Sequence, residues 1–357
     1  MASKGSVLVA MSGGVDSSVA ACLLAEQGYE VLGSHLRLVH LDGADHGCCG
    51  PAARADAETV AEIAGFPFEI ADMTLEFDEH VIGDFVTEHA AGRTPNPCAR
   101  CNAHIKFGAL LRRADELGID LIATGHYVRS ELEGGRWRLR RGVDRSKDQS
   151  YMLHMLGQAE LARSRFPVGS LPKPETRRLA ERFALPVATK PDSQELCFAP
   201  SGDAGAFLRQ AAPELMRDGE VVDPQGRVVA RHGGAAAFTV GQRRGLGVSG
   251  PAPSYVLEVD AAANRVVVGP GELLARRRVL VDRVSWVAGR PPSEGPFETE
   301  VRLRYRGDDV PAVLEADGDR LRVELRAPQR GVAPGQNLVV YRGNEVLGGG
   351  RILDARR

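Results

Sequence analysis

A glycine- and serine-rich loop between a strand and a helix constrains this chain more than any other stretch. The apolar run at residues 7–11 is typical of a buried strand, the loop occupies residues 12–18, and residues 19–25 are typical of a helix. Glycines let the backbone approach a ligand closely, and the loop amides and the helix dipole then face negative charge. No Gly-Lys-Ser/Thr follows, so the loop is not a Walker A motif. The sequence therefore predicts an anion-binding site at this helix N-terminus.

The order of residues in this loop is informative in itself. From residue 12 it reads Ser-Gly-Gly-Val-Asp-Ser-Ser, which resembles the PP-loop signature of enzymes that cleave ATP to AMP and pyrophosphate. The alternative is an ordinary turn between a strand and a helix, and the position and residue order favour the PP-loop.

Composition limits the class of protein. The chain has 357 residues, of which 43% are hydrophobic and 26% charged, as in a globular protein of two or three domains. The net charge of −2 does not indicate a nucleic-acid partner and does not exclude one. No apolar run approaches a membrane span, and no signal-peptide core precedes the first strand. We therefore expect a cytoplasmic protein with no membrane partner, whose six cysteines serve chemistry or metal binding.

Apolar runs and helical patterns alternate through the first part of the chain. After the first strand, further strands are expected over 30–36, 67–71 and 120–124, and helices over 52–64, 77–90, 105–117, 151–161 and 173–183. Such alternation predicts a parallel sheet with helices on both faces. Ligands bind such sheets at the carboxyl ends of the strands, where Ser12, Leu36 and Gly125 lie.

The second half of the chain has a different character. After about residue 205 helical periodicity fades, and short alternating strands follow one another between turn signals. They are expected over 265–268, 300–305, 322–325 and 337–341, with an earlier basic hairpin strand over 136–141. This half is typical of small β modules, the last one a barrel or a sandwich, with a boundary near 269–271.

Three cysteines suggest chemistry. Cys98 and Cys101 form a Cys-x-x-Cys pair after a proline-containing loop, and a helix is expected from near Asn102. Cys101 would then lie at a helix N-terminus, where the dipole favours thiolate. Three interpretations compete: a structural zinc site, which usually needs a second ligand pair; a thioredoxin-like redox pair; and a sulfur-handling or iron–sulfur site that also uses Cys197.

Taken together, the motifs resemble those of the tRNA-specific 2-thiouridylases, bacterial enzymes that convert uridine 34 of certain tRNAs to 2-thiouridine. The matching segments lie at residues 11–18, 92–97, 101–107, 123–127, 147–151, 166–169, 192–198, 241–247, 304–306, 334–336 and 347–350. They cover nearly the whole chain in order and are specific as a set. The resemblance implies an α/β PP-loop domain (adenine nucleotide hydrolase-like) at 1–204, a small β-rich central domain at 205–271 and a tRNA-binding C-terminal β-barrel at 272–357.

The resemblance also implies roles for individual residues. ATP, with Mg²⁺, would bind at Ala10, Met11, Ser12, Gly13, Gly14, Val15, Asp16, Ser17, Leu36 and Gly125. The target base would be approached by Asn96, Pro97 and Cys98. The tRNA would contact His126, Lys147, Asp148, Gln149, Arg304, Tyr305 and Gln336. Cys101 would be the catalytic nucleophile, and Cys197 would carry a persulfide received from a sulfur-donor protein.

One departure from the family pattern leaves the sulfur chemistry open. Many family members have aspartate where Cys98 stands, and an aspartate can act as a general acid or base. A cysteine lacks the carboxylate and is a soft metal ligand. In one route Cys101 attacks the Cys197 persulfide and a transient disulfide joins the two. In the other, Cys98, Cys101 and Cys197 hold a [4Fe-4S] cluster whose open iron carries hydrosulfide.

Two rival functions belong to other classes. The first rival is a PP-loop ligase or amidotransferase that acts on a small molecule. This function would explain the ATP loop, but it would not require the cysteines or the β-rich half. A non-catalytic RNA-binding iron–sulfur protein has no need of the ATP loop. The sequence thus favours a tRNA sulfurtransferase with tRNA and a sulfur-donor protein as partners.

Overall fold

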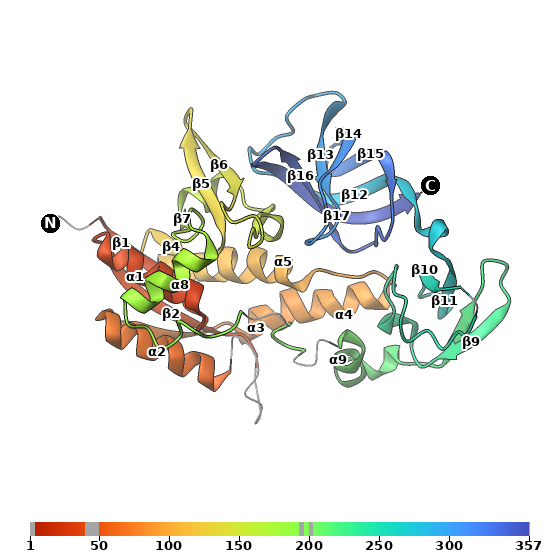
Figure 1. Ribbon diagram of the computed structural model, residues 1–357, viewed down its shortest axis with the longest axis horizontal. Coiled ribbons are helices and arrows are strands. Elements are labelled where there is room, and N and C mark those ends of the chain that lie inside the picture. The colour runs from red at the N-terminus through yellow and green to blue at the C-terminus, as the bar shows by residue number, and fades with distance from the viewer. Residues whose placement is uncertain (1–3, 40–49, 193–195, 200–202, 251, 357) are drawn as a thin grey trace.

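A computed structural model describes residues 4–39, 50–192, 196–199, 203–250 and 252–356. Figure 1 shows an N-terminal unit at the left, a barrel at the upper right in blue, and a smaller unit below the barrel in green and cyan. Cys48, Cys49 and Ser193 lie outside the described residues. Within the described chain, no helix is both long enough and apolar enough to cross a membrane.

Five parallel strands form the N-terminal sheet, in the order β3-β2-β1-β4-β7. They are β1 (Ser6–Ala10), β2 (Glu30–Arg37), β3 (Phe68–Asp72), β4 (Leu121–Ala123) and β7 (Ser164–Arg165). The first four confirm the parallel sheet predicted from the sequence. The fifth is two residues long and carries no periodic pattern, which is why the sequence gives no sign of it.

Helices cover both faces of this sheet. Val7 and Val9 of β1 pack into one apolar cluster and Leu8 into the other, because successive strand side chains point to opposite faces. The first cluster contains α1 (Val15–Glu26), α2 (Pro51–Ala64) and α8 (Lys173–Arg182). The second contains α3 (Thr74–Phe77), η2 (Asp78–Ile82), α4 (Gly83–Ala90), α5 (Pro97–Cys101), η3 (Asn102–Ala109) and α6 (Leu110–Glu116).

The single helix expected over 151–161 is wrong. The chain instead forms a short 3-10 turn, η4 (Ser150–Leu153), and then α7 (Gln158–Ala162). Gly157 separates them, and its N–H donates to Glu160 Oε2 at 2.9 Å. Glycine inside a helix costs about 1 kcal/mol relative to alanine, and here it begins a new helix.

The small unit contains a four-stranded sheet in the order β10-β11-β8-β9. Its strands are β8 (Gly219–Val222), β9 (Val228–His232), β10 (Ser254–Asp260) and β11 (Arg265–Pro270). Short helices border it, namely α9 (Ala204–Ala211), η5 (Pro213–Leu215), η6 (Ala235–Ala237) and η7 (Gly271–Leu274). Val256 and Val266 lie in its core.

The C-terminal unit is a closed barrel. Six antiparallel strands run in the order β12-β15-β14-β13-β16-β17, and β17 pairs back with β12. They are β12 (Arg276–Trp286), β13 (Phe297–Arg302), β14 (Val310–Asp317), β15 (Arg320–Gln329), β16 (Asn337–Arg342) and β17 (Glu345–Arg356). Because the sheet closes on itself, this unit is a barrel and not a sandwich, the two forms that the sequence left open. Leu314, Leu325 and Leu338 fill its interior.

The basic hairpin of β5 (Val128–Glu133) and β6 (Arg136–Arg141) joins the N-terminal unit to the barrel. Leu139 of β6 pairs with Val346 of β17, so the barrel sheet continues into the hairpin. Arg141 is buried, lies 3.5 Å over the ring centre of Tyr341 and donates to Asp309 at 2.8 Å. The hairpin strand was predicted, but its pairing with the barrel was not.

Candidate active site

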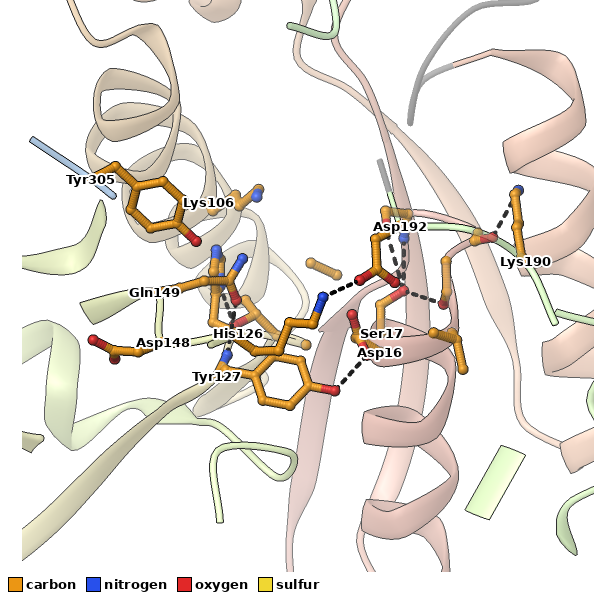
Figure 2. A pocket seen from close by; sticks show the side chains of 18 of the residues that line it. Asp16, Ser17, Lys106, His126, Tyr127, Asp148, Gln149, Lys190, Asp192 and Tyr305 are labelled. Atoms are coloured by element: carbon orange, nitrogen blue, oxygen red, sulfur yellow. Dashed lines mark hydrogen bonds and ion pairs between the residues drawn. The ribbon is translucent and has the colours of Figure 1, made fainter. Parts of the chain in front are cut away.

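A cavity of about 780 Å³ opens at the carboxyl ends of β1 and β4, a volume typical of a site for a nucleotide-sized ligand. Figure 2 shows Asp16, Ser17 and Lys190 on one side and His126, Gln149 and Tyr305 on the other. The cavity therefore lies between the loop after β1 and segments much later in the chain.

The loop after β1 is held in shape by its own serines. Ser12 N–H donates to Ser17 Oγ at 3.2 Å, and the Ser18 hydroxyl donates to the Gly14 carbonyl at 2.9 Å. Helix α1 begins at Val15, and Gly14 at its N-cap supplies no side-chain cap. The first amides of a helix need acceptors, so this end of α1 is suited to an anionic group.

Two glycines let the chain pack tightly around this loop. Gly13 has φ of +67°, and a Cβ there would lie 2.0 Å from the Ala53 carbonyl oxygen. A Cβ on Gly125, which follows β4, would lie 2.5 Å from Ser17 N. No side chain larger than hydrogen fits at either position, so the loop packs closely against α2 and the end of β4 approaches the N-terminus of α1.

Asp16 lies at the centre of an ion-pair network. Lys173 Nζ lies 2.7 Å from Asp16 Oδ1 and 2.8 Å from Asp192 Oδ1, and Lys147 Nζ lies 2.9 Å from Asp192 Oδ2. Burial alone would raise the pKa of Asp192, but hydrogen bonds from Lys173 and Lys147 hold that pKa below its usual value. Arg177 Nη2 lies 3.4 Å from Asp192 Oδ1 as well, so two lysines and an arginine balance two carboxylates beside the loop.

Asp16 lies in the first turn of α1, which has no side-chain cap, so this carboxylate does not cap the helix. Its carboxylate Oδ1 accepts a hydrogen bond from the Tyr127 hydroxyl at 2.8 Å, and that hydroxyl also lies 3.0 Å from Thr176 Oγ1. Tyr127 immediately follows His126, so the carboxyl end of β4 and the loop after β1 are tied together.

The wall opposite the loop comes from residues 126–149. His126 is buried, and its Nδ1 lies 2.8 Å from Thr124 Oγ1. Burial, with a smaller contribution from the Lys106 ammonium, holds the pKa of His126 well below its usual value, so the ring is neutral at neutral pH. Gln149 Oε1 accepts from the Tyr127 N–H at 2.9 Å, which fixes the side chain against the wall.

Asp148 is buried in this wall. Its carboxylate accepts from the Gly142 N–H at 3.1 Å and from the Ser150 hydroxyl at 2.9 Å. Arg141 and Arg302 each approach it to 3.9 Å. Both carboxylate oxygens accept hydrogen bonds from the protein itself, so in this structure Asp148 shapes the wall of the cavity.

The barrel contributes the far rim of the cavity, through Arg302 and residues 305–307. Tyr305 is half-buried between the cavity and α5. Burial and the Asp148 carboxylate raise the pKa of Tyr305, and the thiolate of Cys98 adds to the shift. The Tyr305 ring lines the cavity, and its centre lies 6.0 Å from that of Tyr151 in η4.

That helix begins earlier than predicted. Asn96 is its N-cap and accepts from the Ala99 N–H at 3.1 Å, and Pro97 is its first residue. Proline is favoured at this position because it has no N–H to leave unpaired. Exposed Cys98 lies in the first turn, whereas Cys101 lies one turn further along and is buried. The expectation that Cys101 lies at the helix N-terminus is therefore wrong.

A loop of the barrel supports this segment from outside. Gln336 Nε2 lies 2.9 Å from the Thr94 carbonyl and 3.2 Å from the Pro95 carbonyl. Thr94 N–H donates to the Pro334 carbonyl at 2.8 Å. The strand-like stretch before Cys98 is thus fixed by the barrel, although 242 residues separate Gln336 from Thr94.

The cysteines that the structure describes are thiols and form no disulfide. Cys101 belongs to the apolar cluster beside α4, and Cys197 packs against the same cluster. In the described part of the chain, no three His, Cys, Asp or Glu side chains gather closely enough to hold a metal ion. Cys98, Cys101 and Cys197 therefore do not form a cluster site in this arrangement.

Comparison with known proteins identifies the family. Three family profiles match in succession: a tRNA methyl transferase HUP domain at residues 5–201, a tRNA methyl transferase PRC-barrel domain at 205–270 and an aminomethyltransferase beta-barrel domain at 276–352. A tRNA-specific 2-thiouridylase MnmA from Chloroflexus aurantiacus is 48% identical, and the match covers 97% of this chain and 98% of that protein. The chain belongs to the tRNA-specific 2-thiouridylase family.

Other 2-thiouridylases are similar over the same length. The protein from Mycobacteroides abscessus is 49% identical, over 96% of this chain and 98% of its own. The protein from Mycolicibacterium paratuberculosis is 47% identical, over 98% of this chain and 99% of its own. The likeness therefore includes the sheet domain, the small unit and the barrel together.

The cavity brings together most of the residues that the 2-thiouridylase resemblance singled out. Its lining includes Ala10, Met11, Ser12, Gly13, Gly14, Val15, Asp16, Ser17, Leu36, Gly125, His126, Lys147, Asp148, Gln149 and Tyr305. The lining does not include Asn96, Pro97, Cys98, Cys101, Cys197, Arg304 and Gln336. The nucleotide loop and part of the expected tRNA surface thus share one cavity, and the thiols lie beyond it.

Sequence reasoning missed three lysines of this 2-thiouridylase site. Lys106 and Lys190 line the cavity, and Lys190 Nζ lies 3.0 Å from the Gly13 carbonyl. Lys173 lies behind Asp16 and contacts both carboxylates. A lone lysine has no spacing signature, so only the tertiary structure connects these residues with the loop.

Proposed function

We propose that this protein catalyses ATP-dependent 2-thiolation of uridine 34 in tRNA, releasing AMP and pyrophosphate. One observation carries the proposal: the anion-binding loop of α1 faces the Tyr305 rim within a single cavity, next to the cysteine-bearing helix. Family membership over nearly the whole chain supports the same conclusion.

In the first step ATP binds along the loop of residues 12–17, as the geometry of the α1 N-terminus favours. The C2 oxygen of uridine attacks the α-phosphorus, an O–P bond forms, and pyrophosphate leaves. The uncapped amides of α1 and the Lys190 ammonium face the departing negative charge. Lys173 does not line the cavity, so it acts as a positioning residue that holds Asp16 and Asp192.

Magnesium fits this site as a companion of the nucleotide. Mg²⁺ is usually bound by phosphates together with one or two carboxylates. Asp16 and Asp192 both line the cavity, so they are the carboxylates that would hold the ion on the phosphates. Bound there, it would neutralise charge on the leaving pyrophosphate.

The second step transfers sulfur. Cys197 carries the persulfide, and the Cys101 thiolate attacks the inner sulfur of Cys197. This forms a Cys101–Cys197 disulfide and releases hydrosulfide, so two thiol sulfurs are oxidised while the sulfane sulfur is reduced. Hydrosulfide then attacks C2 of the adenylated uridine, and AMP leaves with the former C2 oxygen. A dithiol reductant restores both thiols before the next turnover.

The alternative iron–sulfur route does not fit the residues as they lie. Cys98 is exposed, whereas Cys101 is buried in the apolar cluster. Since these thiols do not gather into a metal-binding group among the described residues, we derive no step through a cluster.

The remaining assignments follow from position. Asn96, Pro97 and Cys98, in the segment that begins α5, approach the target base. His126, Lys147, Gln149, Arg304 and Tyr305 contact the tRNA around it, and Asp148 and Gln336 hold those contacts in place. We also propose the divisions at 1–204, 205–271 and 272–357, and a separate sulfur-donor protein that loads Cys197.

The direct test is an assay of the purified protein with unmodified tRNA, ATP, Mg²⁺ and a persulfide source. The proposal expects 2-thiouridine at position 34 and release of AMP and pyrophosphate only when tRNA is present. If AMP forms with a small-molecule acceptor and the tRNA gains no sulfur, the proposal is wrong.

A further inference from the structure

The loop at residues 241–247 of the small unit has no part in the chemistry described above. The Gln242 side chain holds it together: Oε1 accepts from the Thr239 N–H at 3.1 Å, and Nε2 donates to the Arg244 carbonyl at 2.9 Å. The loop is attached to β10 through the Gly241 N–H, which donates to the Val256 carbonyl at 2.8 Å. Leu246 is buried in the core of the unit. These hydrogen bonds and the buried leucine therefore hold the loop in a defined conformation.

This loop exposes two arginine side chains to solvent. Arg243 and Arg244 are exposed, and within the described chain neither has a carboxylate partner. Many other exposed arginines are neutralised, such as Arg227 by Asp223 at 2.6 Å. Two adjacent guanidinium groups on a fixed loop thus present uncompensated positive charge.

The loop continues into the barrel surface. A Cβ on Gly241 would lie 3.6 Å from Gly331 Cα, and a Cβ on Gly331 would lie 3.4 Å from Arg304 Nη1. Arg330, beside Gly331, is exposed as well. In Figure 1 the small unit lies below the barrel and to its right. The loops that carry these arginines therefore adjoin, and we call Arg243, Arg244, Arg330 and Arg304 together the arginine row.

The arginine row leads toward the cavity. Strands β14 and β15 are antiparallel, so the β13–β14 loop with Arg304 and the β15–β16 loop with Arg330 lie at the same end of the barrel. That end also carries Tyr305, which lines the cavity, and Gln336, which holds the segment before Cys98. The row therefore starts at the cavity rim and extends outward onto the small unit.

We propose that Arg243 and Arg244 bind the phosphodiester backbone of the tRNA outside the target nucleotide. This inference rests on the proposed function, because that function makes tRNA the polyanion that reaches the cavity. Guanidinium groups pair well with phosphate, and backbone contacts position a nucleic acid without reading its sequence. A net charge of −2 for the whole chain makes such a local basic surface necessary.

The experiment measures equilibrium binding of unmodified tRNA to the full-length protein from about 50 to 200 mM salt. Arg243→Ala/Arg244→Ala is expected to weaken binding about tenfold and to lower the slope of log Kd against log salt by about 1 to 2. Arg243→Lys/Arg244→Lys retains the charge and is expected to recover most of the slope. Arg330→Ala tests the barrel part of the row and should lower the slope by about 1.

The matched control is Arg320→Ala. Arg320 is exposed and lies at the opposite end of β14–β15, where it pairs with Asp317 in the ladder, so its loss should leave tRNA binding as in the wild type. Melting temperatures show whether the variants fold. If the folded alanine double variant keeps the wild-type Kd and slope, the proposal is wrong. The same holds if the variant binds tRNA normally and loses only sulfur delivery from an acidic donor protein.

A parallel thiolation assay separates this proposal from the function on which it rests. Where the wild type thiolates tRNA but the variants bind like the wild type, only the arginine row fails. Where the wild type never thiolates tRNA, the proposed function fails, whatever the arginines do.

Discussion

At the nucleotide end of the site the polar side chains are already paired, whereas the two thiols of the proposed sulfur relay form no disulfide and pack in one apolar cluster. Lys173 and Lys147 hold Asp16 and Asp192 at distances of 2.7 to 2.9 Å. Cys101 is buried and Cys197 partly buried, and they form no disulfide. In the proposed mechanism one end is thus assembled before substrate arrives, and the other is assembled during the reaction.

The difference has a physical basis. Adenylation needs fixed charges around a developing pyrophosphate, and preorganised groups provide this without reorganisation. Sulfur transfer needs two thiols to meet once per turnover and then separate, which permanent contacts would prevent. We therefore expect the two steps to be separable by mutation.

The largest effect should come from the thiols. Cys101→Ser and Cys197→Ser are each expected to reduce thiolation by at least about a thousandfold, because each removes a group that forms a covalent bond in the relay. Pyrophosphate release in the presence of tRNA should stay within a few-fold of wild type. Cys22→Ala is the control, since Cys22 is buried in α1. Equal loss of both activities would show that the ends are not separable.

Asp16→Ala should have the opposite pattern. Removing the carboxylate leaves Lys173 without one partner and frees the Tyr127 hydroxyl, so adenylation is expected to fall about a hundredfold. Affinity for tRNA should change little, because the tRNA contacts come from the wall and the barrel. Binding and pyrophosphate assays on the same preparation check this. A matching loss of tRNA affinity would contradict the division of the site.

A smaller effect is expected at Gln336. Gln336→Ala removes two contacts with the segment before Cys98, and slight misplacement of that segment should slow thiolation about tenfold. Gln329→Ala is the control, because that amide bonds the Ala327 carbonyl within the barrel. A positioning role lowers kcat, whereas a direct tRNA contact raises KM for tRNA. Steady-state kinetics distinguish the two.

The smallest effect concerns pH. Burial lowers the pKa of His126, so its ring stays neutral from pH 8 down to pH 6, and the lysines and arginines that line the cavity carry its positive charge. The affinity for ATP should therefore be flat across this range once the titration of ATP itself is subtracted. His126→Asn should keep the same profile. Binding that tightens below about pH 6.5 and loses this rise in His126→Asn would show a charged histidine.

The sequence predicts local structure well where one pattern dominates. The apolar run of residues 7–11 and the Gly-Ser loop after it correctly placed a strand, a turn and a helix. The start of α5 was missed because Asn96 and Pro97 act as an N-cap pair, a signal that outweighs the helical pattern after Asn102. Gly157 is another local signal that was missed: it begins α7 and so interrupts the single helix expected over 151–161.

Local sequence patterns of this kind do not predict contacts between segments that are distant in the chain. The pairing of Leu139 with Val346, the bonds from Gln336 to the 94–95 segment, and the lysines around Asp16 all depend on register and packing between distant segments. Many of the residues named by the family resemblance line one cavity, but the resemblance did not show that the Asp148 carboxylate accepts hydrogen bonds within the protein.

The most direct test of the separation is a trapping experiment. Cys101→Ser protein is mixed with tRNA, Mg²⁺ and ATP labelled at the α-phosphate, and the label on the tRNA is measured together with the pyrophosphate. The account predicts that AMP stays bound to the tRNA while about one pyrophosphate is released for each AMP retained, because the nucleotide end acts without the thiols. Absence of both labelled tRNA and pyrophosphate from the folded variant would contradict it.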